Sequence, residues 1–478
     1  MDVWDLDATA CAELVRSGEA SPHELVDLAI RRIERFDREL GAVIIPMFDQ
    51  ARASAADVPD GPFRGVPILI KDIDSHVGGV LHTAGVLPLK QANYRPARDS
   101  HLVASLRRAG FIIVGKTNTS ELGIVPSAEP PAWPPSRNPY DTTRSTGGSS
   151  GGSSAAVAAG LVPIAHATDG GGSIRIPASC CGLFGLKPSR GRVSFAPTYG
   201  ELGGGLVNEH VVTRSVRDSA AVLDVLAGAQ PGDPYAAPAQ ARPYTAELGA
   251  PTGTLRIGFD TKHPALDGTL IDAHPDCVAA VAHAARLLAS CGHHVEEAHP
   301  AALRDPEWTP RFLALWAVNV AVGLDECSRA IGRRIEAGEV EPLTWALAEL
   351  GRLVPGPAHA EAWQWIRGNA REASSFWQDF DLYLTPTVAE PPVPLGTFRS
   401  PPDDPLAGIF RSADFAPFTP PFNATGQPAA SLPLYFNTQG LPIGVQLVAA
   451  CGREDVLFRV ASQLEAAQPF EHRATRRG

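Results

Sequence analysis

The stretch Val66-Pro67-Ile68-Leu69-Ile70-Lys71-Asp72 is a short apolar run that ends in two charged residues. Its length and its β-branched residues predict a buried strand. A helix is predicted from Asp99 to Gly110, and Phe111-Ile112-Ile113-Val114 forms a second apolar run directly after it. Two such strands, apolar on both faces and joined by a helix, indicate a parallel sheet that is covered on both sides.

The same alternation continues along the chain. Further strands and helices are predicted at Ser154–Ala159, Val162–Ala165, Leu255–Phe259, Pro275–Ser290, Val295–Glu296, Leu382–Leu384 and Ile443–Val448. Residues 301–380 between them are mainly helical in pattern and rich in tryptophan. Because strands resume after this stretch, we predict one α/β domain over residues 1–478. Its central twisted sheet is mixed, mostly parallel and covered by helices on both faces, with a core at 60–230 and 380–470 and a helical segment at about 301–380 over the functional site.

Composition excludes several classes of function. The 478 residues are 44% hydrophobic and carry a net charge of −11, with no Lys/Arg-rich run, so no nucleic-acid partner is expected. The N-terminus is acidic and no run approaches 18 apolar residues, so neither a secretory signal nor a membrane span is predicted. The seven cysteines form no C-x-x-C pair, which argues against a zinc or redox site. A reducing cytoplasm fits this pattern best.

A tract of glycine and serine, Gly147-Gly148-Ser149-Ser150-Gly151-Gly152-Ser153-Ser154, allows several interpretations. Such tracts are usually flexible linkers, although an apolar helix follows this one at once. A phosphate-binding loop is excluded because no lysine follows the glycines. The match to a G-x-S-x-G nucleophile elbow is interpreted as coincidental, because residues 140–146 are too polar to form the buried strand that precedes such an elbow.

Two further features indicate chemistry. In Thr168-Asp169-Gly170-Gly171-Gly172-Ser173-Ile174-Arg175, three glycines let backbone N–H groups converge on an anion, such as the oxyanion formed when Ser173 attacks a carbonyl. A plain tight turn explains this motif equally well. Lys71 lies at the carboxyl end of a predicted strand, where burial lowers a lysine pKa and makes a general base. A salt bridge with Asp72 or another carboxylate is the commoner alternative.

From the residues alone, a metal site is the main alternative to chemistry at Ser173 and Lys71. Its ligands would come from a cluster near one predicted strand end, comprising His293, His294, Glu296, Glu297 and His299. These residues follow no recognised ligand spacing, so we expect no metal there.

Taken together, these motifs resemble the amidase signature family. The resemblance covers the core motif from Gly147 through the run Asp169–Ser179 to Gly185-Leu186-Lys187-Pro188. Further matches are Lys71-Asp72, Gly115-Lys116-Thr117-Asn118, Pro421-Phe422-Asn423 and Gly426–Ala429. The two family serines stand 24 positions apart, as Ser149 and Ser173 do (173 − 149 = 24). The likeness is near full length and specific.

The resemblance implies a role for each matching residue. Lys71 would be a neutral base, Ser149 a proton relay with a cis peptide bond, and Ser173 the nucleophile. The N–H groups of Gly170, Gly171, Gly172 and Ser173 would form the oxyanion hole. Asp169, Arg175 and Ser150 would support the site, and no metal or cofactor would take part.

Within the family, the chain is most similar to the bacterial branch of 6-aminohexanoate cyclic-dimer hydrolases and urethanases. The likeness is carried by residues 12–19, 43–46 and 175–179, whereas Gly170-Gly171 departs from some members and predicts an altered acyl pocket. The implied substrate is a small amide, carbamate, anilide or ester, and its identity is left open. The oligomeric state is also open, with a homodimer as one option.

Two other functions are carried as alternatives. A glutaminase-type subunit of a tRNA amidotransferase usually has Gln after the arginine of the motif, where this chain has Ile176. An inactive binding module on the same scaffold is the second alternative, and the presence of Lys71, Ser149 and Ser173 argues against it.

Overall fold

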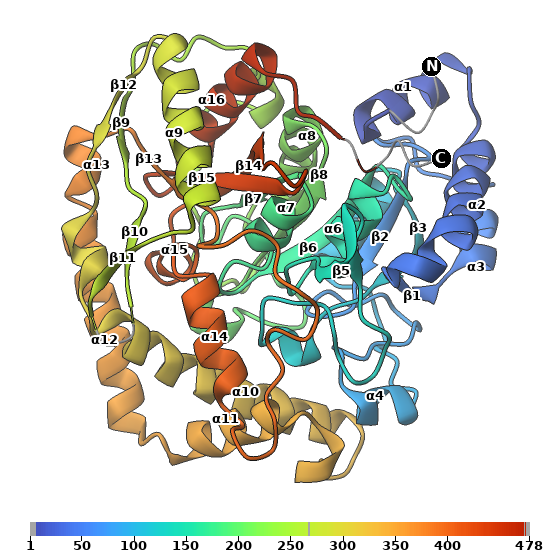
Figure 1. Ribbon diagram of the computed structural model, residues 1–478. Helices are drawn as coiled ribbons and strands as arrows, with labels where there is room; N and C mark the ends of the chain where they lie inside the picture. The colour runs from blue at the N-terminus through green and yellow to red at the C-terminus, as the bar shows by residue number, and fades with distance from the viewer. Residues whose placement is uncertain (1–5, 266–267, 473, 475–478) are drawn as a thin grey trace.

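A computed structural model describes residues 6–265, 268–472 and 474. One 11-stranded sheet runs through the molecule in the order β1-β3-β2-β6-β8-β7-β14-β15-β13-β9-β12 (Figure 1). Its strands are β1 (Val43–Pro46), β2 (Pro67–Lys71), β3 (Ile112–Thr117), β6 (Ile164–Asp169), β7 (Phe184–Lys187), β8 (Asn208–Thr213), β9 (Arg256–Phe259), β12 (His294–Glu297), β13 (Leu382–Pro386), β14 (Ala429–Phe436) and β15 (Pro442–Ala449). Two small hairpins lie outside it, β4 (Arg137–Asn138) with β5 (Asp141–Ser145) and β10 (Lys262–Pro264) with β11 (Leu270–Asp272).

Helices cover both faces of this sheet. They are α1 (Ala8–Ser17), α2 (Pro22–Leu40), α3 (Phe48–Ser54), α4 (Leu87–Gln91), α5 (His101–Arg108), α6 (Gly151–Ala158), α7 (Arg175–Cys180), α8 (Val216–Leu226), α9 (Pro275–Ser290), α10 (Trp308–Ala330), α11 (Pro342–Leu353), α12 (Gly356–Ala373), α13 (Phe376–Asp379), α14 (Ala407–Phe415), α15 (Pro420–Thr425) and α16 (Glu454–Ala467). Figure 1 shows α10, α11 and α12 together at one end of the molecule.

The strand residues divide between two cores. Ile68 and Ile70 of β2 pack in the same cluster as α5, α8, α9 and α16, whereas Leu69 between them packs with α2 and α6. Successive side chains of a strand point to opposite faces, so a continuous apolar strand needs cover on both sides. The predicted single α/β domain with a mixed, two-sided sheet is confirmed.

Parallel pairing is less extensive than expected. In the described part of the chain, four neighbouring strand pairs are parallel and six are antiparallel. The parallel pairs form two blocks, β3-β2-β6 and β13-β9-β12. The sheet also extends beyond the expected core of 60–230 and 380–470, because β1, β9 and β12 belong to it. Apolar runs alone do not report strand direction, which explains the difference.

Most predicted elements are present. β2, α5 and β3 follow one another as expected, and α9 has the predicted bounds, Pro275–Ser290. Two elements differ from the prediction. Helix α6 begins at Gly151, three residues before the expected start, and β6 runs from Ile164 through Asp169 instead of stopping at Ala165.

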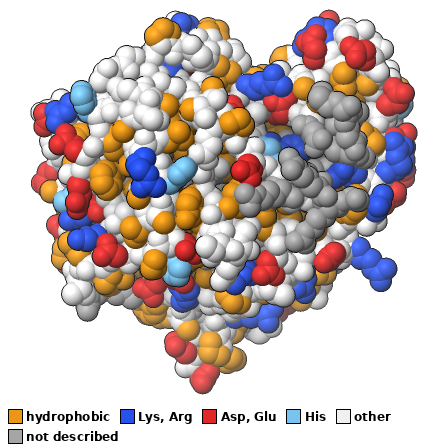
Figure 2. All heavy atoms as spheres, turned by 45° about the horizontal axis from the view of Figure 1, so that its top comes forward, with side chains coloured by type: hydrophobic (Ala, Val, Ile, Leu, Met, Phe, Trp, Pro, Cys, Tyr) orange, Lys and Arg blue, Asp and Glu red, His pale blue; other side chains and the backbone are white. Residues whose placement is uncertain are grey.

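The segment 301–380 is mainly helical, as predicted, and its tryptophans are buried or partly exposed. Trp308 and Trp363 are buried, and, of this segment's tryptophans, Trp308 and Trp316 line the apolar cavity beside Ser173 that is described below. Within the described residues, no helix is long and apolar enough to cross a membrane. The face drawn in Figure 2 carries acidic and basic side chains side by side.

Candidate active site

The carboxyl ends of β2 and β6 bring Lys71 next to Thr168. The two strands are parallel, with Leu69 opposite Ala165, so their ends meet at one edge of the sheet. The Lys71 Nζ donates to the Thr168 Oγ1 (2.9 Å) and to the Ser149 Oγ (2.8 Å). These contacts place Lys71 and Ser149, 78 residues apart in the sequence, in direct hydrogen-bond contact.

Burial sets the protonation of Lys71. Its side chain is fully buried, which disfavours the ammonium form and lowers its pKa to about 8. Asp74, Asp169 and Glu209 act against this effect, because their negative charges favour the ammonium. A substantial fraction of Lys71 is therefore neutral in mildly alkaline solution.

Lys71 does not pair with Asp72, which was the commoner alternative. The Asp72 carboxylate instead forms a buried ion pair with the Lys116 Nζ, and Thr83 donates to it through its amide (3.1 Å) and its hydroxyl. Lys116 also donates to the Leu81 carbonyl (3.0 Å). The partners of the Asp72 carboxylate are thus Lys116 and Thr83, whereas Lys71 contacts Ser149 and Thr168.

The Gly/Ser tract is a packed part of the core, so the linker interpretation is wrong. All residues of 147–154 are buried, and residues 151–154 form the first turn of α6. The peptide bond between Gly148 and Ser149 is cis, as the family resemblance implies. A Cβ on Gly148 would lie 2.1 Å from the Ser127 carbonyl oxygen, so only glycine fits there. The tract follows β5, which lies outside the main sheet, so the elbow match is indeed coincidental.

Ser150 ties this tract to the glycine loop. Its Oγ donates to the Thr168 carbonyl (3.1 Å) and accepts from the Thr168 amide (3.2 Å). Its own amide donates to the Ser173 carbonyl (3.3 Å). These bonds hold Ser149, one residue earlier, beside the loop that carries Ser173.

The loop from Asp169 to Ser173 presents backbone N–H groups around Ser173. The Gly172 amide donates to the Asp169 Oδ1 (2.7 Å), so this expected oxyanion donor is already engaged. In the described chain, the amides of Gly170, Gly171 and Ser173 have no protein acceptor. Gly172 has a φ of +131°, and a Cβ there would lie 2.2 Å from the Thr419 Oγ1. Glycine is therefore required at this position.

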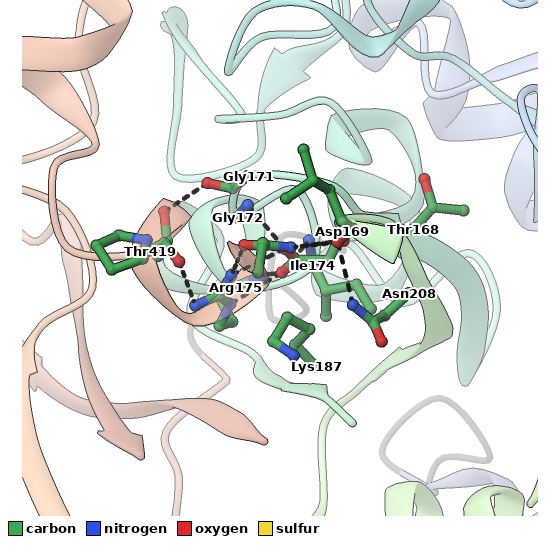
Figure 3. A network of polar contacts seen from close by, with 12 residues as sticks. Thr168, Asp169, Gly171, Gly172, Ile174, Arg175, Lys187, Asn208 and Thr419 are labelled. Atoms are coloured by element: carbon green, nitrogen blue, oxygen red, sulfur yellow. Dashed lines mark hydrogen bonds and ion pairs between the residues drawn. The ribbon is translucent and has the colours of Figure 1, made fainter. Parts of the chain in front are cut away.

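Asp169 and Arg175 form a two-point ion pair beneath the loop (Figure 3). The Arg175 Nε and Nη2 donate to the two carboxylate oxygens at 2.9 and 2.8 Å. Burial alone would raise the pKa of Asp169, but the Arg175 charge and hydrogen bonds outweigh it and lower the pKa to about 2. Both side chains are fully buried and fully engaged, which is the geometry of supports.

Arg175 also fixes segments from the C-terminal third of the chain. Its Nη1 donates to the Thr419 carbonyl (3.0 Å) and the Gln446 Oε1 (2.7 Å), and its Nη2 donates to the Asn423 Oδ1 (2.6 Å). Asn423 in turn donates to the Asp169 carbonyl and carboxylate, both at 2.8 Å. The loop is thereby held from α15 and β15 as well as from its own strand.

Replacing Arg175 by alanine is expected to lower the free energy of unfolding by about 3–5 kcal/mol, because it leaves the buried Asp169 carboxylate without its counter-charge. Urea unfolding followed by fluorescence measures the change. Arg352→Ala is the matched control, because Arg352 forms partly exposed ion pairs with Asp325 and Glu349 and should cost less than about 1 kcal/mol. Equal losses in the two variants would contradict the supporting role of Arg175.

Several residues at the site escaped the sequence analysis. Thr168 and Asp74 were not singled out, and Thr419 and Gln446 carried no local pattern. Asn423 was noted only within a matching tripeptide. Only their positions could have indicated them. Thr168 lies near the carboxyl end of β6 and Asp74 lies shortly after β2, and the carboxyl ends of these two parallel strands meet at one edge of the sheet.

An apolar cavity of about 130 Å³ opens beside Ser173. Gly123, Gly171 and Ser173 belong to its lining, and a Cβ on Gly123 would lie 3.2 Å from the Ser149 Oγ. The rest of the lining is mostly apolar and includes Ile124, Val125, Ile176, Leu303, Trp308, Phe312, Leu313, Trp316, Ile409, Pro417, Pro420 and Pro421. The only charged residue in the lining, within the described chain, is the exposed Asp414. The cavity suits an uncharged, largely apolar group.

His293, from the histidine cluster near β12, has a structural role. The His293 Nδ1 accepts from the Leu255 amide (3.2 Å), and its Nε2 contacts the Gln463 Oε1 (2.8 Å). Within the described residues, no group of three or more His, Cys, Asp or Glu side chains is arranged to hold a metal ion.

The chain was compared with protein families and with known proteins. The model of the family described as Amidase matches residues 24–458. The chain belongs to the amidase signature family. It is accordingly a hydrolase that acts on carbon–nitrogen bonds of amides.

Its relatives cover the whole length of this amidase. A 6-aminohexanoate-cyclic-dimer hydrolase of Pseudomonas sp. (strain NK87) is 42% identical, over 98% of this chain and 96% of the relative. The solved structure of a 6-aminohexanoate cyclic dimer hydrolase complexed with substrate superimposes with a TM-score of 0.95 at 41% identity, covering 99% and 100% of the two chains. A bacterial aryl acylamidase of the family superimposes with a TM-score of 0.87 at 26% identity, covering 99% of each.

Proposed function

We propose that this amidase works through a triad in which Lys71 is the base, Ser149 the relay and Ser173 the nucleophile. The observation that carries the proposal is the buried hydrogen bond of 2.8 Å between the Lys71 Nζ and the Ser149 Oγ. A lysine with a pKa near 8 accepts a proton from a hydroxyl group far more readily than an ordinary lysine. Ser173 lies on the adjoining loop and lines the apolar cavity.

The proposed reaction has the following steps. Neutral Lys71 takes a proton from Ser149, Ser149 takes one from Ser173, and the Ser173 oxygen attacks the amide carbon. The amides of Gly170, Gly171 and Ser173 stabilise the oxyanion. Ser149 returns a proton to the leaving nitrogen, because an amide anion is a poor leaving group. Water then attacks the acyl-enzyme by the reverse relay and releases the acid.

The substrate that we propose is a small uncharged amide with a flexible apolar acyl part, of the kind represented by the 6-aminohexanoate cyclic dimer. The cavity beside Ser173 supports this class, since its lining is mostly aliphatic, aromatic and proline. The names of the relatives point to the same substrate. Residues 301–380 would cover the bound acyl group, because Leu303, Trp308 and Phe312 contribute to the lining.

A hydrolysis screen tests this assignment. The substrates are the cyclic dimer and linear oligomers of 6-aminohexanoate, short fatty amides, anilides and aryl carbamates, and the readout is kcat/KM for each. We expect the cyclic dimer to be cleaved with the highest kcat/KM, because it carries no charge into the apolar cavity. Cleavage of charged linear oligomers in preference to the cyclic dimer would contradict the substrate class.

The same screen, run on Phe312→Ala, tests the covering segment. Phe312 stacks on Trp316, with ring centroids 5.6 Å apart, and its ring lies 3.6 Å from the Cβ position of Gly171. The variant should change the order of preference among substrates. Trp345→Ala is the control from the same segment, because Trp345 does not line the cavity, and its order of preference should match that of the wild type.

A further inference from the structure

A second cavity, of about 400 Å³, lies next to the first. Trp316 lines both cavities, and the second is formed by residues from the end of β2, from the loop before β8 and from α10. Its volume is well above the space that one water molecule occupies. Nothing in the proposed acyl site accounts for it.

The charged groups of this cavity are all acidic. Asp74, Glu201 and Glu326 line it, and no Lys or Arg is among the described residues of its lining. Glu201 binds the Tyr235 hydroxyl at the exposed rim, whereas the Glu326 carboxylate has no hydrogen-bond or ion-pair partner within the described chain. Burial raises the pKa values of Asp74 and Glu326, and it outweighs the opposing effects of Lys71 and Thr168 at Asp74 and of Arg329 at Glu326.

His76 gives an independent indication of a ligand. Its side chain is only 9% exposed, lines the cavity and has no hydrogen-bond partner in the described part of the chain. Burial lowers its pKa to about 4, so the ring is neutral and offers one nitrogen as an acceptor. Tyr94 and Tyr199 add aromatic rings to the same lining. Carboxylates, a neutral imidazole and aromatic rings together suit an ammonium group.

The cavity lies on the relay side of the site. Asp74 is three residues beyond Lys71, close enough for the two charges to shift each other's pKa. Val207 and Trp316 of the lining lie 3.3 Å from the Cβ position of Gly170, next to the nucleophile loop. In the proposed reaction Ser149 gives its proton to the leaving nitrogen, so that nitrogen faces the side of the relay.

We propose that this acidic cavity, lined by Asp74, His76 and Glu326, is a subsite that binds the ammonium group of the amine formed by amide cleavage. The inference rests on the proposed function, because hydrolysis supplies the amine. The proton from Ser149 releases the nitrogen as a neutral amine, which takes a second proton from the surrounding water. Held there as an ammonium ion, it has no lone pair to attack the acyl-enzyme. The subsite would therefore favour hydrolysis over re-formation of the amide.

Hexylamine and its neutral counterpart 1-hexanol test the subsite by calorimetric binding to the full-length protein. We expect the wild type to bind hexylamine at least about tenfold more tightly than hexanol. Glu326→Gln should weaken hexylamine binding about tenfold and leave hexanol binding unchanged. Asp325→Asn is the matched control, because it removes a charge from the same helix outside the cavity and should bind hexylamine as the wild type does.

The outcomes separate this proposal from the proposed function. Undiminished hexylamine binding by Glu326→Gln, in a protein that hydrolyses amides, would overturn the subsite alone. Glu326-dependent hexylamine binding in a protein that hydrolyses no amide would support the cation site and overturn the function. If Glu326→Gln does not fold, Glu326→Ala repeats the measurement, since alanine keeps the helix propensity of α10.

Discussion

Ser173→Ala is expected to lower kcat for amide hydrolysis by about 10⁴-fold or more, because it removes the hydroxyl group that we propose as the nucleophile. Ser173 is the serine of the glycine loop that lines the apolar cavity, whereas Ser149 is hydrogen-bonded to Lys71. The measurement is single-substrate kinetics on the best amide of the screen, together with labelling by a fluorophosphonate probe. The variant should lose labelling as well as turnover.

Ser412→Ala is the matched control for this experiment. Ser412 lines the same cavity, but its hydroxyl donates to the Gly408 carbonyl (2.6 Å) and takes no part in the relay. Its kcat should stay within a few-fold of the wild type. If Ser173→Ala kept a tenth of the wild-type activity, the nucleophile would lie elsewhere, with Ser149 the next candidate. Absence of labelling in the wild type would instead favour an inactive binding module.

The second large effect is the pH dependence of kcat/KM, which we expect to follow the protonation of Lys71. Its pKa is lowered to about 8, and only the neutral amine accepts a proton. The wild-type kcat/KM should therefore fall about tenfold for each pH unit below 8 and level off above it. In Lys71→Ala, this rise of kcat/KM with pH should be absent, and the hydrolysis of amides should be severely slowed. The substitution should affect activated esters less, because their leaving groups depart without a proton.

Two further variants sharpen the test. Lys71→Arg should be nearly as damaging as Lys71→Ala, because guanidinium stays charged and cannot act as a base. Lys262→Ala, at an exposed position of the β10–β11 hairpin, should keep the wild-type profile. If kcat/KM of Lys71→Ala still rose with pH and had the same midpoint as in the wild type, another group would be the base.

The sequence predicted the layered fold well because that information is local. The apolar run before Lys71 and the run at residues 111–114 identify buried strands without reference to any other part of the chain. Strand direction was predicted less well. The antiparallel pairing of β6 with β8, for example, depends on a connection through α7 and β7 that no short pattern specifies.

The site was predictable only where the family resemblance named the residues. Nothing in the local sequence relates Lys71 to Ser149, since their contact depends on how β2 and α6 pack. The Gly/Ser tract has the composition of a linker, and only its burial and its close contacts with Ser127 show that it is packed into the core. The hydrogen bond from the Gly172 amide to the Asp169 carboxylate could not be predicted either, because it depends on the conformation of the loop.

The contacts of Arg175 have a consequence for how the protein is made. The loop that carries Ser173 is complete in sequence by Arg175, yet its anchors Asn423 and Gln446 lie 248 and 271 residues later. A ribosome would therefore have to synthesise nearly the whole polypeptide before the loop reaches its final shape. A nascent or prematurely terminated chain would carry every proposed reactive group and still lack an ordered centre.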